Sequence, residues 1–96
     1  MSKTILLTGA SRGLGRIIAE YLYPKGYRLI LVARSASGLK ETREKLGSDS
    51  VSNVDCISWD LSNIDELRGL VEQIRSKYGK IDVLVNNAGV EQYGEF

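Results

Sequence analysis

A glycine-rich segment near the start of the chain constrains its fold more than any other feature. Residues 8–15 read T-G-A-S-R-G-L-G and separate a short apolar run, residues 3–7, from a helix-like run that begins near Gly13. A glycine-rich turn between a strand and a helix places backbone N–H groups beside the positive end of the helix. Gly9 lets the chain turn sharply off the strand, and Gly15 lets the helix sit close to the sheet. The segment therefore predicts a strand–turn–helix unit with a phosphate site at the turn.

Two further positions in this segment favour an anion. Gly13 removes a Cβ where a pyrophosphate would approach, and the guanidinium of Arg12 could reach a phosphate. The spacing G-x-x-x-G-x-G nevertheless differs from the dinucleotide fingerprint G-x-G-x-x-G. Because glycine-rich turns also serve as plain connections, this segment alone leaves a purely structural turn as an alternative.

Short apolar runs alternate with helix-like runs along the chain. We expect strands over residues 4–8, 27–33, 54–59 and 81–85, and helices from about 13 to 22, 39 to 46 and 64 to 78. Strict alternation with short, apolar strands predicts a parallel sheet with helices on its faces. We therefore expect an α/β, doubly wound architecture, a partial Rossmann fold of four parallel strands and about three helices, with strand order 3-2-1-4.

Apolar spacing predicts which face of each helix is buried. In the first helix the residues spaced by three and four are Leu14, Ile17, Ile18 and Leu22. The second helix has the weakest pattern, with an inner face of Leu39, Thr42, Arg43 and Leu46. The third helix has the clearest one, formed by Ile64, Leu67, Leu70, Val71, Ile74 and Tyr78. Ser62 is expected to cap this third helix, and Asp65 to complete a capping box.

Composition is that of an ordinary globular domain. The chain has 96 residues, 43% of them apolar and 26% charged, which allows one domain at most. A net charge of +1 gives no reason to expect a nucleic acid or an acidic membrane as partner. We also expect no signal peptide and no membrane span, and the lack of His excludes histidine-based catalysis or metal binding. The single cysteine, Cys56, is expected in the core and not in a redox site, and it fits a reducing, cytoplasmic setting.

Polar features follow all four expected strands. They are the glycine loop, Arg34, Asp60 and the N-N-A-G stretch at residues 86–89. Because the carboxyl ends of parallel strands meet at one edge of the sheet, where open α/β sheets bind ligands, we expect these features to converge. Each also has a plainer interpretation: Arg34 as a solvated loop charge, Asp60 as a turn or capping residue, and the two asparagines as a strand-end turn.

On these residues the chain resembles the N-terminal part of a short-chain dehydrogenase/reductase. Residues 8–15 match that family's T-G-x-x-x-G-x-G loop, Asp60 matches its adenine-contacting acid, and residues 86–89 match its N-N-A-G stretch letter for letter. The resemblance covers essentially the whole chain. The loop spacing is similar to that of the short, single-domain branch and not to that of the extended, epimerase-like branch.

The resemblance implies a role for each matching residue. The cofactor pyrophosphate and adenosine ribose would be surrounded by Gly9, Ser11, Arg12, Gly13, Leu14 and Gly15. Adenine would be held by Asp60 and Leu61. The ribose side of the cofactor would be lined by Asn87, Ala88 and Gly89, while Asn86 would mainly brace the sheet.

Charge at the end of the second strand bears on the choice of cofactor. A carboxylate there would bind the ribose 2′-OH of NAD, but the sequence reads Ala33-Arg34 with no Asp or Glu nearby. Arg34, together with Arg12, would pair with the 2′-phosphate of NADP. We therefore expect NADP as cofactor, with NADPH bound more tightly than NADH.

The residues that would carry the family's chemistry do not occur at matching positions in this sequence. They are a Tyr-x-x-x-Lys pair, a Ser and a further Asn, all beyond the N-N-A-G stretch. Tyr21 and Lys25 have the pair's spacing, but we expect Tyr21 to pack and Lys25 to face solvent. We interpret residues 1–96 as the N-terminal portion of an NAD(P)-binding domain, truncated before its catalytic segment, which should not transfer hydride alone.

Three functions stay open at this point. The chain could be the cofactor half of an NADP-dependent reductase acting on an unknown small carbonyl or alcohol substrate. It could instead be a stand-alone, non-catalytic dinucleotide-binding or regulatory module. In the third interpretation it is a structural partner that completes its sheet with another chain, since an uncovered edge strand favours association. The sequence leaves a homo-oligomer as a possible assembly.

Overall fold

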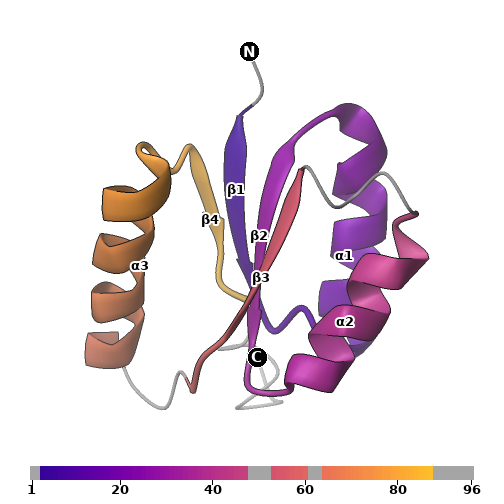
Figure 1. Cartoon of the computed structure of the whole chain (residues 1–96), viewed down its shortest axis with the longest axis horizontal. Helices are drawn as coiled ribbons and strands as arrows, with labels where there is room; N and C mark the ends of the chain where they lie inside the picture. The colour runs from indigo at the N-terminus through magenta and orange to yellow at the C-terminus, as the bar shows by residue number, and fades with distance from the viewer. Residues whose placement is uncertain (1–2, 48–52, 61–63, 88–96) are drawn as a thin grey trace.

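Four parallel strands and three α-helices form the part of the chain that the computed structural model describes, residues 3–47, 53–60 and 64–87 (Figure 1). The elements in chain order are β1 (Thr4–Thr8), α1 (Gly13–Leu22), a 3₁₀ turn η1 (Tyr23–Lys25), β2 (Arg28–Ala33), α2 (Ala36–Lys45), β3 (Val54–Ser58), α3 (Ile64–Tyr78) and β4 (Val83–Val85). The sheet order is β3-β2-β1-β4, with every pairing parallel. This confirms the predicted α/β, doubly wound architecture and its strand order.

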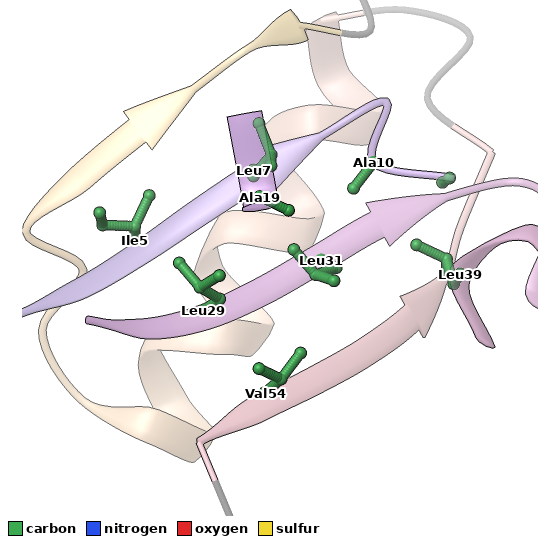
Figure 2. Close-up of a cluster of buried hydrophobic side chains, with 9 residues drawn as sticks. Ile5, Leu7, Ala10, Ala19, Leu29, Leu31, Leu39 and Val54 are labelled. Atoms are coloured by element: carbon green, nitrogen blue, oxygen red, sulfur yellow. The ribbon is translucent and has the colours of Figure 1, made fainter. Parts of the chain in front are cut away.

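Helices cover both faces of the sheet, and the strands divide their side chains between two cores. Figure 1 shows α1 and α2 on one side and α3 on the other. Leu7 pairs in register with Leu31, and both pack on the side of α1 and α2 (Figure 2). Their neighbours Leu6 and Ile30 pack on the opposite side, in a cluster that contains residues of α3. Such two-sided burial explains why the strands are apolar throughout.

The buried face of α1 differs from the one that its apolar spacing predicts. Leu14 and Ile17 are 53% and 61% exposed, whereas Gly15 and Ala19 are buried. The two small residues let the helix backbone approach the sheet closely, and Leu14 and Ile17, one position before Gly15 and two before Ala19, turn toward solvent. The prediction for Ile18 and Leu22 holds, since both pack against the core.

The prediction that Tyr21 packs was also wrong. Its side chain is 67% exposed, and the Lys25 ammonium lies 4.4 Å from the centre of its ring. One turn of helix separates the two residues, so an exposed cation–π contact replaces burial.

Helix α2 begins earlier than the sequence predicts, and a side chain caps its first turn. The helix begins at Ala36 and not at Leu39, because the Ser35 hydroxyl caps it by accepting a hydrogen bond from the Gly38 N–H at 3.0 Å. Leu39 and Thr42 are buried, as predicted. The Ser62 cap predicted for α3 lies outside the described residues.

Strand β4 is shorter than predicted and lies at an edge of the described sheet. The Asp82 carboxylate accepts a hydrogen bond from the Thr4 N–H at 2.8 Å, and the Asp82 N–H donates to the Thr4 carbonyl at 2.9 Å. The segment before Val83 is thus tied to β1 partly through a side chain, so the regular strand begins only at Val83. Val83 and Leu84 are 42% and 44% exposed. None of the helices in the described ranges is both long and apolar enough to cross a membrane.

Truncating a buried and an exposed apolar side chain tests this assignment of faces. Leu31→Ala is expected to lower the free energy of unfolding by about 2–5 kcal/mol, because Leu31 is fully buried. Ile17→Ala is expected to change it by no more than about 0.5 kcal/mol, because that side chain is mostly in water. Urea unfolding followed by circular dichroism gives both values. Equal losses of unfolding free energy in the two variants would contradict the orientation of α1.

Candidate functional site

The glycine loop lies where the strand order changes direction. It joins the carboxyl end of β1 to α1, and β1 has β2 on one side and β4 on the other. The residues that follow these neighbouring strands, Arg34 and Asn86, therefore flank the loop, as expected from the sequence. Such a switch point is the usual ligand site of an open α/β sheet.

Glycine is required at three positions around the loop. Gly9 and Gly13 have φ values of 66° and 56°, in the left-handed region that side-chain-bearing residues rarely adopt. At Gly15 the requirement is space, because a Cβ there would lie 1.8 Å from the Gly9 carbonyl oxygen and 2.6 Å from its carbon. The backbone of α1 is thus in direct contact with the turn that precedes it.

The carbonyl groups of the loop are held by side chains from other parts of the chain. Gly9 O accepts from Asn87 Nδ2 at 3.2 Å, Ala10 O from Thr42 Oγ1 at 2.7 Å, and Ser11 O from the Arg16 guanidinium. The peptide bonds are trans, so each N–H points opposite to the preceding carbonyl. The N–H groups of Ser11 and Arg12 are therefore directed away from Thr42 and Arg16.

The N-terminus of α1 adds positive character to the same place. The first N–H groups of a helix have no acceptor within it, and the helix dipole places partial positive charge there. In the described residues of α1, the extended N-cap residue Arg12 makes no side-chain capping bond, and the first turn holds no acidic residue. The helix end therefore keeps its capacity to bind an anion.

On the β2 side of the loop stand a cation and hydroxyl groups. Arg34 is exposed directly after β2, and its carbonyl accepts a hydrogen bond from Ser58 Oγ at 2.8 Å. Ser35 Oγ lies 3.3 Å from Ser37 Oγ while it caps α2. Arg12, in the loop itself, is also exposed.

On the β4 side the asparagines serve as braces. Thr8 Oγ1 donates to Asn86 Oδ1 at 3.0 Å and thus links the ends of β1 and β4. Asn87 is buried, at 4% exposure, with its amide directed at the Gly9 carbonyl. Its role toward a cofactor ribose stays a prediction. Asp60, after β3, is exposed, while the predicted site residues Leu61, Ala88 and Gly89 lie outside the described residues.

Sequence reasoning missed three residues that support the loop: Arg16, Thr42 and Gly38. A Cβ on Gly38 would lie 2.7 Å from Ser11 Cβ, so this glycine lets α2 approach the loop. Thr42, a threonine on the predicted inner face of the second helix, was a signal of a close contact. Gly38 gave none, because it lay just before the helix as the sequence predicts it. Arg16 carried no comparable signal, because all of its side-chain contacts apart from the Ser11 carbonyl are with a different helix.

Cys56 lies outside this site. Its thiol is partly buried where α2 packs on β3, 3.8 Å from the Leu39 carbonyl oxygen. Burial raises the pKa of Cys56, against the lowering effect of Arg43, and Asp55 raises it further. A thiol with a raised pKa is a poor nucleophile, which agrees with the core interpretation.

Comparison with known proteins assigns the family. The family model for short chain dehydrogenases matches residues 3–96. The chain belongs to the short-chain dehydrogenase family. The doubly wound sheet and the glycine loop at its switch point are the parts of that family's fold present in the described residues.

Individual members of the family are similar over most of this chain. It is 44% identical over 94 residues to the ketoacyl reductase HetN of a Nostoc species, covering 98% of this chain and 32% of that protein. It is 40% identical over 93 residues to a 3-oxoacyl-[acyl-carrier-protein] reductase, FabG, of Staphylococcus aureus, covering 94% of this chain and 37% of that protein. A variant actinorhodin polyketide ketoreductase solved with NADPH matches with a TM-score of 0.73 and 35% identity, covering 88% of this chain and 32% of that one. The chain thus spans about a third of the length of these relatives.

Adding a methyl group at Gly15 tests the contact on which the loop is built. Gly15→Ala is expected to lower the free energy of unfolding by about 1–3 kcal/mol or more, because the new Cβ would overlap the Gly9 carbonyl. The matched control is Gly69→Ala in α3, where a Cβ meets no atom within 4 Å. Because alanine favours a helix, the control should gain up to about 1 kcal/mol. Thermal unfolding measures the stability of both variants. Equal changes in the two would contradict the close approach of α1 and the loop.

Proposed function

We propose that this chain is the NADP(H)-binding half of a short-chain dehydrogenase/reductase. In the full-length protein, a hydride would pass between NADP(H) and a small carbonyl or alcohol substrate. The observation that carries the proposal is the glycine loop, whose carbonyls are turned inward beside an uncapped helix N-terminus and two exposed arginines. This arrangement suits a ligand with more than one phosphate group.

The pyrophosphate is the part of the cofactor that the loop would bind. The outward N–H groups of Ser11 and Arg12 would donate to its oxygens, and the end of α1 would supply partial positive charge. Gly9, Gly13 and Gly15 give the loop its conformation, and Leu14 belongs to the first turn of the helix. No side chain at Gly13 would obstruct the ligand.

The choice of NADP over NAD rests on charge. Residues 33–40 include Arg34 and no acidic residue, so no carboxylate at the end of β2 would repel a 2′-phosphate. The exposed Arg34 and Arg12 would pair with that phosphate. The hydroxyls of Ser35 and Ser37, which follow Arg34 in the chain and lie 3.3 Å apart, would be further donors to it. The NADPH bound to the similar polyketide ketoreductase supports the same choice.

Other parts of the cofactor would contact residues after β3 and β4. We assign the adenine to Asp60 and Leu61, and the ribose side to Asn87, Ala88 and Gly89. Asn87 would act through the loop as well, since it holds the Gly9 carbonyl. We place this half-site in a cytoplasmic protein, a setting that suits the single free cysteine.

In this proposal the chain binds the cofactor, and the rest of the protein carries the catalytic and substrate-binding residues. The nicotinamide of a bound cofactor supplies or accepts the hydride, while the residues of this chain bind and orient the phosphate and adenosine parts. The chain spans about a third of its relatives' length, so the catalytic residues and the substrate-binding walls are assigned to the remaining part.

Reversing one charge tests the cofactor assignment. Arg34→Asp is expected to weaken NADPH binding by about tenfold or more, because it replaces a charge-assisted partner of the 2′-phosphate with a repelling carboxylate. NADH binding should change much less, or improve, since aspartate can accept from the ribose 2′-OH. Titrations followed by nucleotide fluorescence give both dissociation constants.

The matched control is Arg68→Asp, which makes the same change at an exposed position of α3 on the other side of the sheet. It should leave both affinities within about twofold, since solvent screens the distant charge. If the wild-type chain bound neither nucleotide, the proposed function would be wrong. If Arg34→Asp lowered both affinities equally, the 2′-phosphate assignment would fail.

A further inference from the structure

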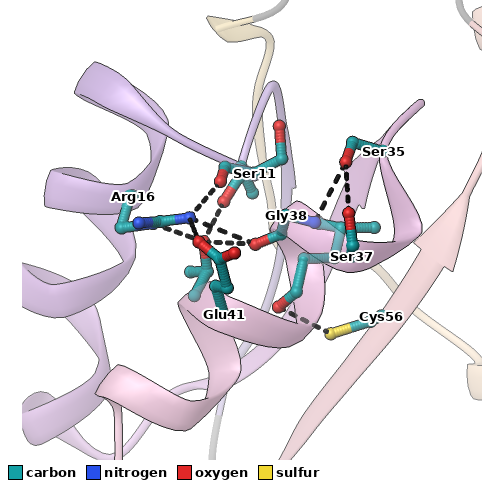
Figure 3. A network of polar contacts seen from close by, with 10 residues as sticks. Ser11, Arg16, Ser35, Ser37, Gly38, Glu41 and Cys56 are labelled. Carbon is teal, nitrogen blue, oxygen red and sulfur yellow. Dashed lines mark hydrogen bonds and ion pairs between the residues drawn. The ribbon is translucent and has the colours of Figure 1, made fainter.

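Arg16 connects three elements around the glycine loop. It belongs to α1, but its Nε donates to Thr42 Oγ1 of α2 at 2.9 Å and its Nη2 donates to the Ser11 carbonyl of the loop. The same Nη2 lies 3.3 Å from the Gly38 carbonyl and 3.4 Å from the Glu41 carboxylate. Figure 3 shows the guanidinium between the loop and the first turns of α2. The side chain is only 18% exposed, so these contacts are partly shielded from water.

Thr42 completes this connection through its hydroxyl. The residue is fully buried, and its Oγ1 accepts from Arg16 while donating to the Ala10 carbonyl at 2.7 Å. Arg16 and Thr42 are therefore one hydrogen-bonded pair that holds the successive carbonyls of Ala10 and Ser11. The orientation of the loop's outward N–H groups depends on this pair, because each peptide unit is planar.

The part of α2 that the pair joins to the loop is the part next to Arg34. Ser35 caps the helix at Gly38, and a Cβ built on Gly38 would lie 3.1 Å from both the Ser11 carbonyl oxygen and Ser35 Oγ. The loop thus rests directly on the first turn of α2. The spacing between Arg12, in the loop, and Arg34, just before that turn, is set at this contact.

We propose that Arg16 is a positioning residue that sets the NADPH preference of this site. The inference rests on the proposed function. Both nicotinamide cofactors carry the pyrophosphate, whereas only NADPH carries the 2′-phosphate, which Arg12 and Arg34 would bind from two different elements. A change in the spacing of these elements therefore penalises NADPH more than NADH.

Lysine cannot replace arginine in this role. The planar guanidinium donates in several fixed directions at once, here to the loop and to two residues of α2. An ammonium group keeps the charge but lacks this fixed geometry. Arg16→Lys therefore separates the positioning role from a simple contribution of positive charge.

The test compares cofactor selectivity in variants of the 96-residue chain. Arg16→Lys and Thr42→Val are each expected to weaken NADPH binding by about tenfold and NADH binding by about threefold or less, as fluorescence titrations would show. Thr42→Ser keeps the hydroxyl and should restore selectivity to within about twofold of the wild type. Arg68→Lys, an exposed arginine of α3, is the matched control and should change neither affinity. Far-UV circular dichroism measures the folded fraction of each variant.

Each result has a defined meaning. Equal weakening of both cofactors, or unchanged binding in Arg16→Lys and Thr42→Val, would overturn the inference while leaving the proposed function intact. Loss of the fold in both variants would make the pair purely structural and would overturn it too. A wild-type chain that binds neither cofactor would contradict the proposed function, and this inference with it.

Discussion

The inward orientation of the carbonyl groups at Gly9, Ala10 and Ser11 is the constraint on which the site depends. In a planar peptide the N–H points away from the carbonyl, so side chains that hold the carbonyls of a turn also fix the direction of its donors. Carbonyls that are buried in this way need such partners. Here the acceptors are satisfied by Asn87, Thr42 and Arg16. The capacity to bind a phosphate group is thus a property of the surrounding fold and not of the glycine motif alone.

The fold brings these partners together through its strand order and its small residues. With β1 between β2 and β4, residues from distant parts of the chain reach the same turn. Gly15 allows α1, and Gly38 allows α2, to approach the loop more closely than any larger residue would. The two apolar cores hold the helices in place on either side of the sheet. The site is therefore formed by the packing of α1 and α2 against the loop.

Local patterns in the sequence predict the architecture and the edge where the site lies. Alternation of apolar strands with periodic helices gives the parallel sheet, and Arg34 and Asn86 follow their strands as expected. The same patterns fail where packing between elements determines which side chains are buried and which contacts form. Leu14 and Ile17 continue the apolar spacing of α1, yet the approach of Gly15 and Ala19 turns them toward solvent. Arg16 and Thr42 lie 26 positions apart, so their hydrogen bond follows only from the completed fold.

The most direct test of this account is an NMR titration of the isotope-labelled chain with NADPH, in which every backbone amide is observed separately. The account predicts that the largest shifts occur at the amides of Ser11, Arg12, Gly13 and Leu14, with smaller shifts around Arg34. The chemical shifts of amides on the outer face of α3 should not change. Saturable binding that leaves the amide shifts of residues 11–14 unchanged, or that changes those of α3 instead, would contradict the claim that this loop binds the pyrophosphate.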